Sequence, residues 1–269
     1  MNPLYAMVAA AALAGAPTDG EPSLDELIER IARSSKEDRR PVAQQGFGTA
    51  RSPNFTVTVA RDPALARDLL ARAESLREEI ALRWIGSPLP EGVAHTVIHL
   101  HRDDAADVGR LVPADGVTQT RHWLWLRTSR ERALGTTLAH EMTHVVLSTR
   151  FPEGMPVWAN EGIASLEDDA ERHAIRRERL AHLARSERWP SVAEVMSMPH
   201  ISPDDTTAYS VAVSLTEFLL ERGPRGDFLR FVETGADGNW NAALREFYKI
   251  DGTADLQREW QVWLANRER

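Results

Sequence analysis

The chain contains no cysteine among its 269 residues. This absence excludes disulfide bonds, thiolate zinc sites and cysteine nucleophiles. Lysine is nearly absent as well, because it occurs only as Lys36 and Lys249, so arginine carries the positive charge. A cysteine-free chain suits an oxidising or a reducing compartment, and the compartment has to be inferred from other features.

An excess of positive charge is also lacking. The chain has 32 Lys and Arg against 40 Asp and Glu, which gives a formal net charge of −8. Proteins that bind nucleic acids through phosphate contacts need a basic surface, so we expect no nucleic-acid partner. The hydrophobic content of 42% is ordinary for a soluble globular protein, and the length allows one large domain or two small ones.

Long hydrophobic runs are absent apart from the first segment, MNPLYAMVAAAALAGAPTDG. The apolar run from Leu4 to Ala16 is too short to span a bilayer as a helix. It ends in Ala14-Gly15-Ala16, a pattern that signal peptidases cut, although no Lys or Arg precedes it. We expect residues 1–20 to be a signal peptide or apolar tail. The mature chain would be exported, to the periplasm or outside the cell, without a stable membrane span, and a cytoplasmic protein is the alternative.

Residues 21–51 are expected to form a short helix and a linker. Ser23 and Glu26 match a capping box at the start of a helix over 23–33, and the polar stretch 34–51 follows. We expect one folded domain over residues 52–269, with an α/β part to residue 150 and a helical part from residue 151.

The first half of this domain has the pattern of strands around one long helix. Asp62-Pro63 would cap and open that helix, which ends near Gly86 and carries Leu65, Leu69, Ala73, Leu76 and Ile80 on one face. β-Branched content and alternation predict strands at 55–59, 95–100 and 122–127, with a Gly/Asp-rich loop before the last. Helices are expected near 129–148, 160–185, 206–222, 227–233, 240–248 and 255–266. A mixed sheet followed by helices is an α+β arrangement.

The stretch LAHEMTHVVL, Leu138 to Leu147, contains H-E-x-x-H. His140 and His144 are four positions apart, so on a helix both imidazoles share one face and can bind one ion. Glu141 is rotated by about 100° from His140. It can therefore reach a metal-bound water without being a ligand.

The alternative for these histidines is a helix with two satisfied core side chains. Apolar neighbours such as Met142 and Val145 indicate that the motif is at least half buried. Burial of a His-Glu-His cluster without a partner is costly, and a divalent cation would compensate it. A metal site is the better interpretation.

A third ligand is expected, because catalytic zinc usually keeps three protein ligands and one open position. After a Pro/Gly turn over 151–156, the stretch VWANEGIAS places Glu161 early in the next helix. An antiparallel helix returning from that turn would bring Glu161 beside His140 and His144. We expect one zinc ion.

These two motifs resemble those of the gluzincin metallopeptidases, the thermolysin-like group, and most of all their compact bacterial MA-like branch. The resemblance covers roughly residues 55–266, with only H-E-x-x-H and W-x-N-E-G specific. It implies a zincin-like fold, zinc bound by His140, His144 and Glu161, and Glu141 as the base that activates water. It also implies that the strand 122–127 holds an extended peptide.

The sequence departs from that group after Glu161. Thermolysin-like enzymes have N-E-x-x-S-D, where the Asp orients a zinc-binding His, whereas Ser165 occupies that position here. Glu167 and Asp168 follow and are interpreted as a solvated helix face. Tyr209 resembles a tyrosine of related peptidases that stabilises the oxyanion, and a core tyrosine with its hydroxyl at the surface is the alternative.

The remaining histidines are not expected to bind metal. His173, His182 and His200 stand in polar contexts and are interpreted as surface residues. His95, His99 and His101 share one strand face, but no carboxylate with matching spacing follows them.

The function indicated is a zinc-dependent metallopeptidase acting on a peptide or protein substrate. One alternative is a zincin-like binding or scaffold domain whose catalysis has lapsed. Another is a zinc hydrolase of a non-peptide substrate, because fold and metal do not determine the substrate.

Overall fold

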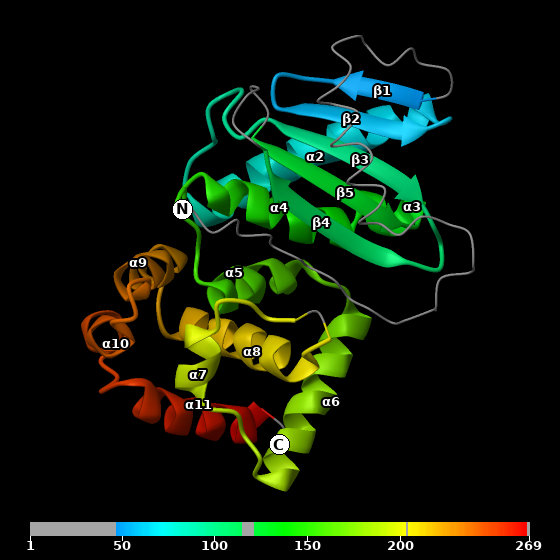
Figure 1. The fold of residues 1–269 in the computed structure, drawn as a ribbon. Coiled ribbons are helices and arrows are strands. Elements are labelled where there is room, and N and C mark those ends of the chain that lie inside the picture. Colours follow the sequence, from blue (N-terminus) through cyan, green and yellow to red (C-terminus); the bar gives the residue numbers. More distant parts are fainter. Residues whose placement is uncertain (1–46, 115–120, 203, 268–269) are drawn as a thin grey trace.

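The computed structural model describes residues 47–114, 121–202 and 204–267. Its first half is a five-stranded mixed sheet (Figure 1). The strands are β1 (Phe47–Arg51), β2 (Phe55–Ala60), β3 (Thr96–Arg102), β4 (Asp107–Pro113) and β5 (His122–Thr128). They lie in the order β1-β2-β3-β5-β4, with β2, β3 and β5 parallel and the two outer strands antiparallel to their neighbours.

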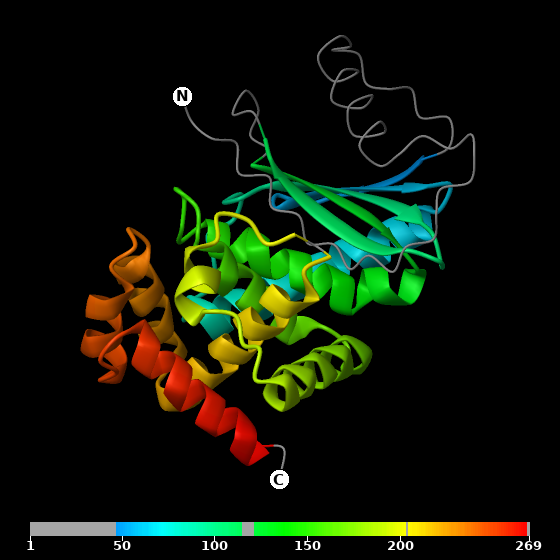
Figure 2. The same cartoon turned by 60° about the horizontal axis from the view of Figure 1, so that its bottom comes forward.

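The described helices all lie on one side of this sheet (Figure 2). They are α2 (Pro63–Trp84), α3 (Arg130–Leu134), α4 (Thr136–Ser148), α5 (Val157–Ala164), α6 (Ala170–Ser186), α7 (Val192–Ser197), α8 (Thr206–Arg222), α9 (Arg225–Gly235), α10 (Trp240–Tyr248) and α11 (Thr253–Arg267), with a 3-10 turn over Ser165–Glu167. The predicted α+β class is confirmed. Within the described part, none of these helices is long and apolar enough to cross a bilayer.

The sheet and α2 form the core that the sequence pattern predicts. The N-cap Asp62 accepts a hydrogen bond from the backbone N of Leu65 at 2.8 Å, and Pro63 occupies the first turn. The predicted apolar face of α2 is buried against the inward side chains of β2, including Phe55 and Val57. Each such fully buried apolar side chain contributes roughly 1.5–3 kcal/mol relative to an exposed one.

Several predicted boundaries are wrong. The expected loop before β5 contains β4, and the last five residues of the expected linker form β1. The expected helix over 129–148 is broken at Gly135, whose φ and ψ are both −122°, into α3 and α4. The helix expected over 160–185 is divided by the 3-10 turn, and α7 was not predicted. The expected signal segment and the helix over 23–33 lie outside the described residues.

The prediction that strand 122–127 holds an extended peptide is also wrong. These residues form β5, which pairs with β3 along one edge and with β4 along the other. A strand with both edges paired has no backbone groups left for a further strand. Among the described strands, β4 ends the sheet order on this side.

The helical half is held together around α5 and α8. The indole of Trp158 in α5 is fully buried and packs against the rings of Phe228, Phe231 and Trp240, with centroid distances of 6.1, 6.3 and 5.6 Å. Gly162, also in α5, lies directly against α8. Because glycine has no Cβ, these two helices can approach closely.

We predict that Gly162→Ala destabilises the protein. A Cβ at this position would lie 2.2 Å from Oγ1 of Thr216 and 2.9 Å from the backbone oxygen of Ala212. Overpacking of this kind typically lowers the free energy of unfolding by about 1–3 kcal/mol. Urea unfolding should show the loss, whereas Gly226→Ala, at a glycine with open space around it, should leave the midpoint nearly unchanged. Equal midpoints for the two variants would contradict the prediction.

Candidate metal centre

The H-E-x-x-H motif lies in α4, a helix that is buried on every side. All residues from Thr137 to Leu147 are buried, between the sheet, α2 and α5. A helix with apolar residues all around is a core helix, so polar side chains in it need partners. His140 and His144 are therefore placed in the interior of the protein.

Helix α5 brings Glu161 to the two histidines. The turn after α4 contains Gly154, whose φ of +101° is a conformation that glycine adopts without strain. The chain then runs back along α4. Asn160 of α5 contacts His144, and Asp168, which follows α5, contacts His140 one turn earlier in α4. The antiparallel return predicted from the sequence is thus observed.

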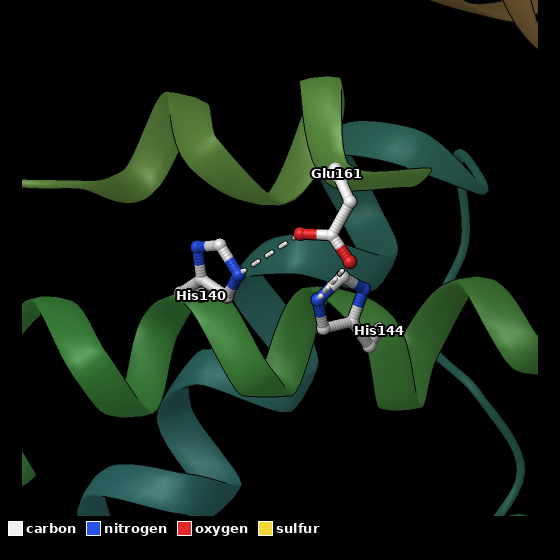
Figure 3. Close-up of side chains that lie close together, drawn as sticks. All are labelled: His140, His144 and Glu161. Carbon is white, nitrogen blue, oxygen red and sulfur yellow. Dashed lines mark ion pairs between the residues drawn. The ribbon is translucent and has the colours of Figure 1, made fainter. Parts of the chain in front are cut away.

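The side chains of His140, His144 and Glu161 converge on one point (Figure 3). The distance from Glu161 Oε2 to His140 Nε2 is 3.7 Å, and that from Glu161 Oε1 to His144 Nε2 is 3.8 Å. The three ligand atoms all lie within 4.8 Å of one another. Two ligands of a tetrahedral zinc ion are about 3.4 Å apart, given zinc–ligand distances near 2.1 Å.

The atoms that face this point have no partner of their own. His140 Nε2, His144 Nε2 and Glu161 Oε2 are buried without a hydrogen bond. Such atoms are costly to bury unless something satisfies them. This group, the only one of its kind in the described part of the chain, could bind a metal ion.

The second nitrogen of each imidazole determines its tautomer. His140 Nδ1 lies 3.1 Å from Asp168 Oδ1, and His144 Nδ1 lies 3.1 Å from Asn160 Oδ1. Because both oxygens are acceptors, each Nδ1 carries the proton and donates it. In the neutral form of each imidazole, Nε2 then has a lone pair directed at the common point, which is the arrangement a metal-ligating histidine needs.

Asp168 is not on a solvated helix face, so that interpretation was wrong. Its side chain is 1% exposed and is paired with Arg172 at 3.1 Å and with Arg176. If α5 continued without a break, Asp168 would lie seven residues beyond Glu161, about 10 Å further along the helix axis. The 3-10 turn ends α5 instead, and Asp168 comes to lie beside His140. Ser165 contacts Arg176, not a histidine.

The charges around the site suit cation binding. Burial alone would lower the pKa of His140, but the carboxylate of Asp168 outweighs it and raises the pKa to about 10. Burial lowers the pKa of His144, which favours its neutral form. Burial opposes ionisation of Glu161, yet the neighbouring His144 and His140 hold its pKa below the usual value. In the metal-free protein a protonated His140, a neutral His144 and the carboxylate of Glu161 therefore face one point, and a bound cation would replace the proton on His140 Nε2.

Glu141 lies beside this group without belonging to it. Its side chain is buried, and its Oε2 has no hydrogen-bond partner. Burial, with Glu161 adding to it and His140 opposing it, raises the pKa of Glu141 to about 8. A carboxylate with such a pKa can accept and return a proton near neutral pH.

Tyr209 of α8 reaches the same site. Tyr209 is 9% exposed, and its hydroxyl interacts with the carboxylate of Glu161. Burial and the charge of Glu161 raise its pKa, so the phenol keeps its proton. The hydroxyl therefore lies at the candidate ligand and not at the surface.

The other histidines lie away from this centre. His182 and His200 are exposed and His173 is half-buried. On the sheet, His99 stacks on the ring of Trp125 at a centroid distance of 4.2 Å, and burial lowers its pKa to about 4.

Sequence reasoning missed two residues of the site, Asp168 and Asn160. Signals for both were present. Asn160 is a polar residue inside the otherwise apolar start of α5, and Asp168 is followed at four and eight positions by Arg172 and Arg176. An acidic residue with arginines at helical spacing is a candidate for a buried ion-paired carboxylate.

No protein-family model, curated protein or solved structure matches the chain. The function therefore has to be inferred from the chemistry of this centre.

We predict that Zn²⁺ stabilises the folded protein through His144. An ion that binds only the folded state adds about 2.7 kcal/mol at a hundred times its Kd. Metal-free protein should unfold at a higher temperature after Zn²⁺ is added, and His144→Ala should abolish the shift. The exposed His182 provides the matched control, His182→Ala. A shift of equal size in His144→Ala would mean that zinc binds elsewhere.

Asp168→Asn should weaken zinc binding about 10- to 100-fold, the usual effect of removing a carboxylate that orients a ligating histidine. Competition with a chromophoric chelator measures the Kd in folded protein. Glu171→Gln removes a carboxylate from the first turn of α6, three residues further on, and it should leave the affinity unchanged because the Glu171 side chain is 69% exposed. Equal affinities of Asp168→Asn and the parent would show that Asp168 does not support His140.

Proposed function

We propose that this protein is a zinc-dependent metallopeptidase of the gluzincin type, with a zincin-like fold. The observation that carries the proposal is the group of three buried ligand atoms without partners, with Glu141 beside them but outside the group. Two imidazoles and one carboxylate form a ligand set typical of catalytic zinc. The adjacent carboxylate is where such a site needs a base.

The number of ligands supports a catalytic ion over a structural one. Structural zinc sites are closed by four protein ligands, whereas catalytic sites keep one position open. In the described residues the group contains three ligands, and the carboxylate of Asp168, which contacts His140, is already engaged with that residue, Arg172 and Arg176. One position is thus left for water or substrate.

The proposed reaction is hydrolysis of a peptide bond. A bound zinc ion would supply a Lewis acid that polarises the substrate carbonyl and acidifies water. Glu141 takes a proton from the attacking water and delivers it to the nitrogen of the leaving amine. Asp168 and Asn160 hold the two imidazoles in the tautomers that keep Nε2 available.

Tyr209 is the proposed donor to the oxyanion. Its phenol keeps its proton and interacts with Glu161, and it would exchange this contact for one to the oxyanion of the reacting carbonyl. Donors preorganised in this way stabilise the charge that develops in the transition state.

The substrate would be a peptide or protein that lies along β4. This strand ends the sheet order and packs against α4. An extended peptide added to this edge as a further strand would pass close to Glu141, because the side chain of Glu141 lies against Gly109 of β4.

Glu141→Gln should retain zinc and lose at least about 10²-fold in turnover, because it removes the proton acceptor and keeps the shape. Cleavage of a diverse peptide library, with and without a chelator, measures the effect. Glu178→Gln changes an exposed glutamate of α6 and should cleave at the parental rate. Parental turnover in Glu141→Gln would refute the assignment of the base. A zinc-loaded parent that cleaves no peptide would instead favour a scaffold domain or a non-peptide hydrolase.

A further inference from the structure

Gly109 of β4 lies directly against the side chain of Glu141. A Cβ added to Gly109 would be 2.3 Å from Glu141 Oε1 and 2.6 Å from both Cδ and Cγ. Such distances are impossible for real atoms. Any other residue at position 109 would therefore require something to move.

The backbone conformation does not explain this glycine. Gly109 lies within a strand, and its φ is outside the left-handed region, so other residues could adopt its conformation. Glycine weakens a strand interior, and where it occurs it often marks the close approach of another group. The group that approaches here is the carboxylate of Glu141.

The strand itself is held in place and cannot easily move away. Six further residues of β4 are in register with β5, and Asp107 fixes the beginning of the strand. The carboxylate of Asp107 accepts hydrogen bonds from Thr128 at 2.9 Å and Thr137 at 2.5 Å and forms an ion pair with Arg172. These contacts connect β4 to β5, α4 and α6.

Helix α4 is equally constrained, because it is buried along its whole central part. The movable partner is the end of the Glu141 side chain. A methyl group at position 109 would thus displace the carboxylate and leave both backbones in place. Substitution would have a large effect on the position of this one carboxylate, because Cγ as well as the carboxyl group would have to shift.

We propose that Gly109 is a positioning residue: because it has no Cβ, it leaves the space beside β4 that the Glu141 carboxylate occupies. The inference rests on the proposed function, in which Glu141 is the catalytic base. Displacement of a reacting group by about 1 Å can cost about a hundredfold in rate. Gly109 would then affect kcat through Glu141 without contributing to zinc binding.

The test is Gly109→Ala in the full chain. We expect kcat to fall about a hundredfold, with the Kd for zinc unchanged within about threefold. A crystal structure of the zinc-loaded variant should show the Glu141 carboxylate displaced from β4. Gly109→Ala/Glu141→Gln should be no slower than Glu141→Gln alone, because one step is affected by both changes. Gly226→Ala, the same substitution at an uncrowded glycine, should match the parent in every measurement.

Stability gives a second readout that does not depend on activity. If Gly109→Ala lowers the unfolding temperature through the contact with Glu141, Gly109→Ala/Glu141→Ala should restore it, because truncation removes the clashing atoms. Failure to restore it would show that Gly109 accommodates the strand and not the carboxylate, and would overturn the inference.

Two further results would overturn it. One is a Gly109→Ala variant with parental kcat and an unmoved carboxylate. The other is a loss of zinc affinity as large as the loss of kcat. Parental turnover in Glu141→Gln would refute the proposed base alone, and the position of the carboxylate in the Gly109→Ala crystal structure would still decide the role of Gly109.

Discussion

The structure depends on three buried ionisable side chains, His140, His144 and Glu161, that make no hydrogen bonds to one another. The carboxylate of Glu161 lies 3.7 Å from His140 and 3.8 Å from His144, too far for hydrogen bonds and at a separation that a single ion would bridge. Removal of such groups from water is costly unless a counter-charge compensates it. An ion bound by this group would stabilise α4 and α5, so that folding and metal binding would be linked.

A second layer of charge supports this centre. Arg172 bridges Asp168, which holds His140, and Asp107, which anchors β4. One ion-pair network therefore holds both the candidate ligand His140 and the strand beside Glu141, and it joins the sheet to the helical half. Removal of one partner from a buried network of this kind leaves an uncompensated charge, so its members act together.

Short-range features of this protein could be predicted from the sequence more fully than long-range ones. Helical spacing placed His140 and His144 on one face, and the turn before α5 placed Glu161 beside them. The breaks at Gly135 and after Ala164 were missed, because no proline marks either position and contacts with distant segments, such as that of Asp168 with His140, accompany the second break. Strand β4 was taken for a loop, since its Asp, Gly and Arg residues are poor strand formers and its pairing with β5 is what makes it a strand.

The amino-acid sequence by itself determined the α+β class, the residue types that could ligate an ion and their order along the chain. These follow from local periodicity, which acts over a few residues. The tertiary structure decided that Asp168 orients His140, that β5 is an interior strand, and that Gly109 contacts Glu141. Each of these is a contact between segments far apart in the chain, and packing of the whole domain, not local preference, determines which segments meet.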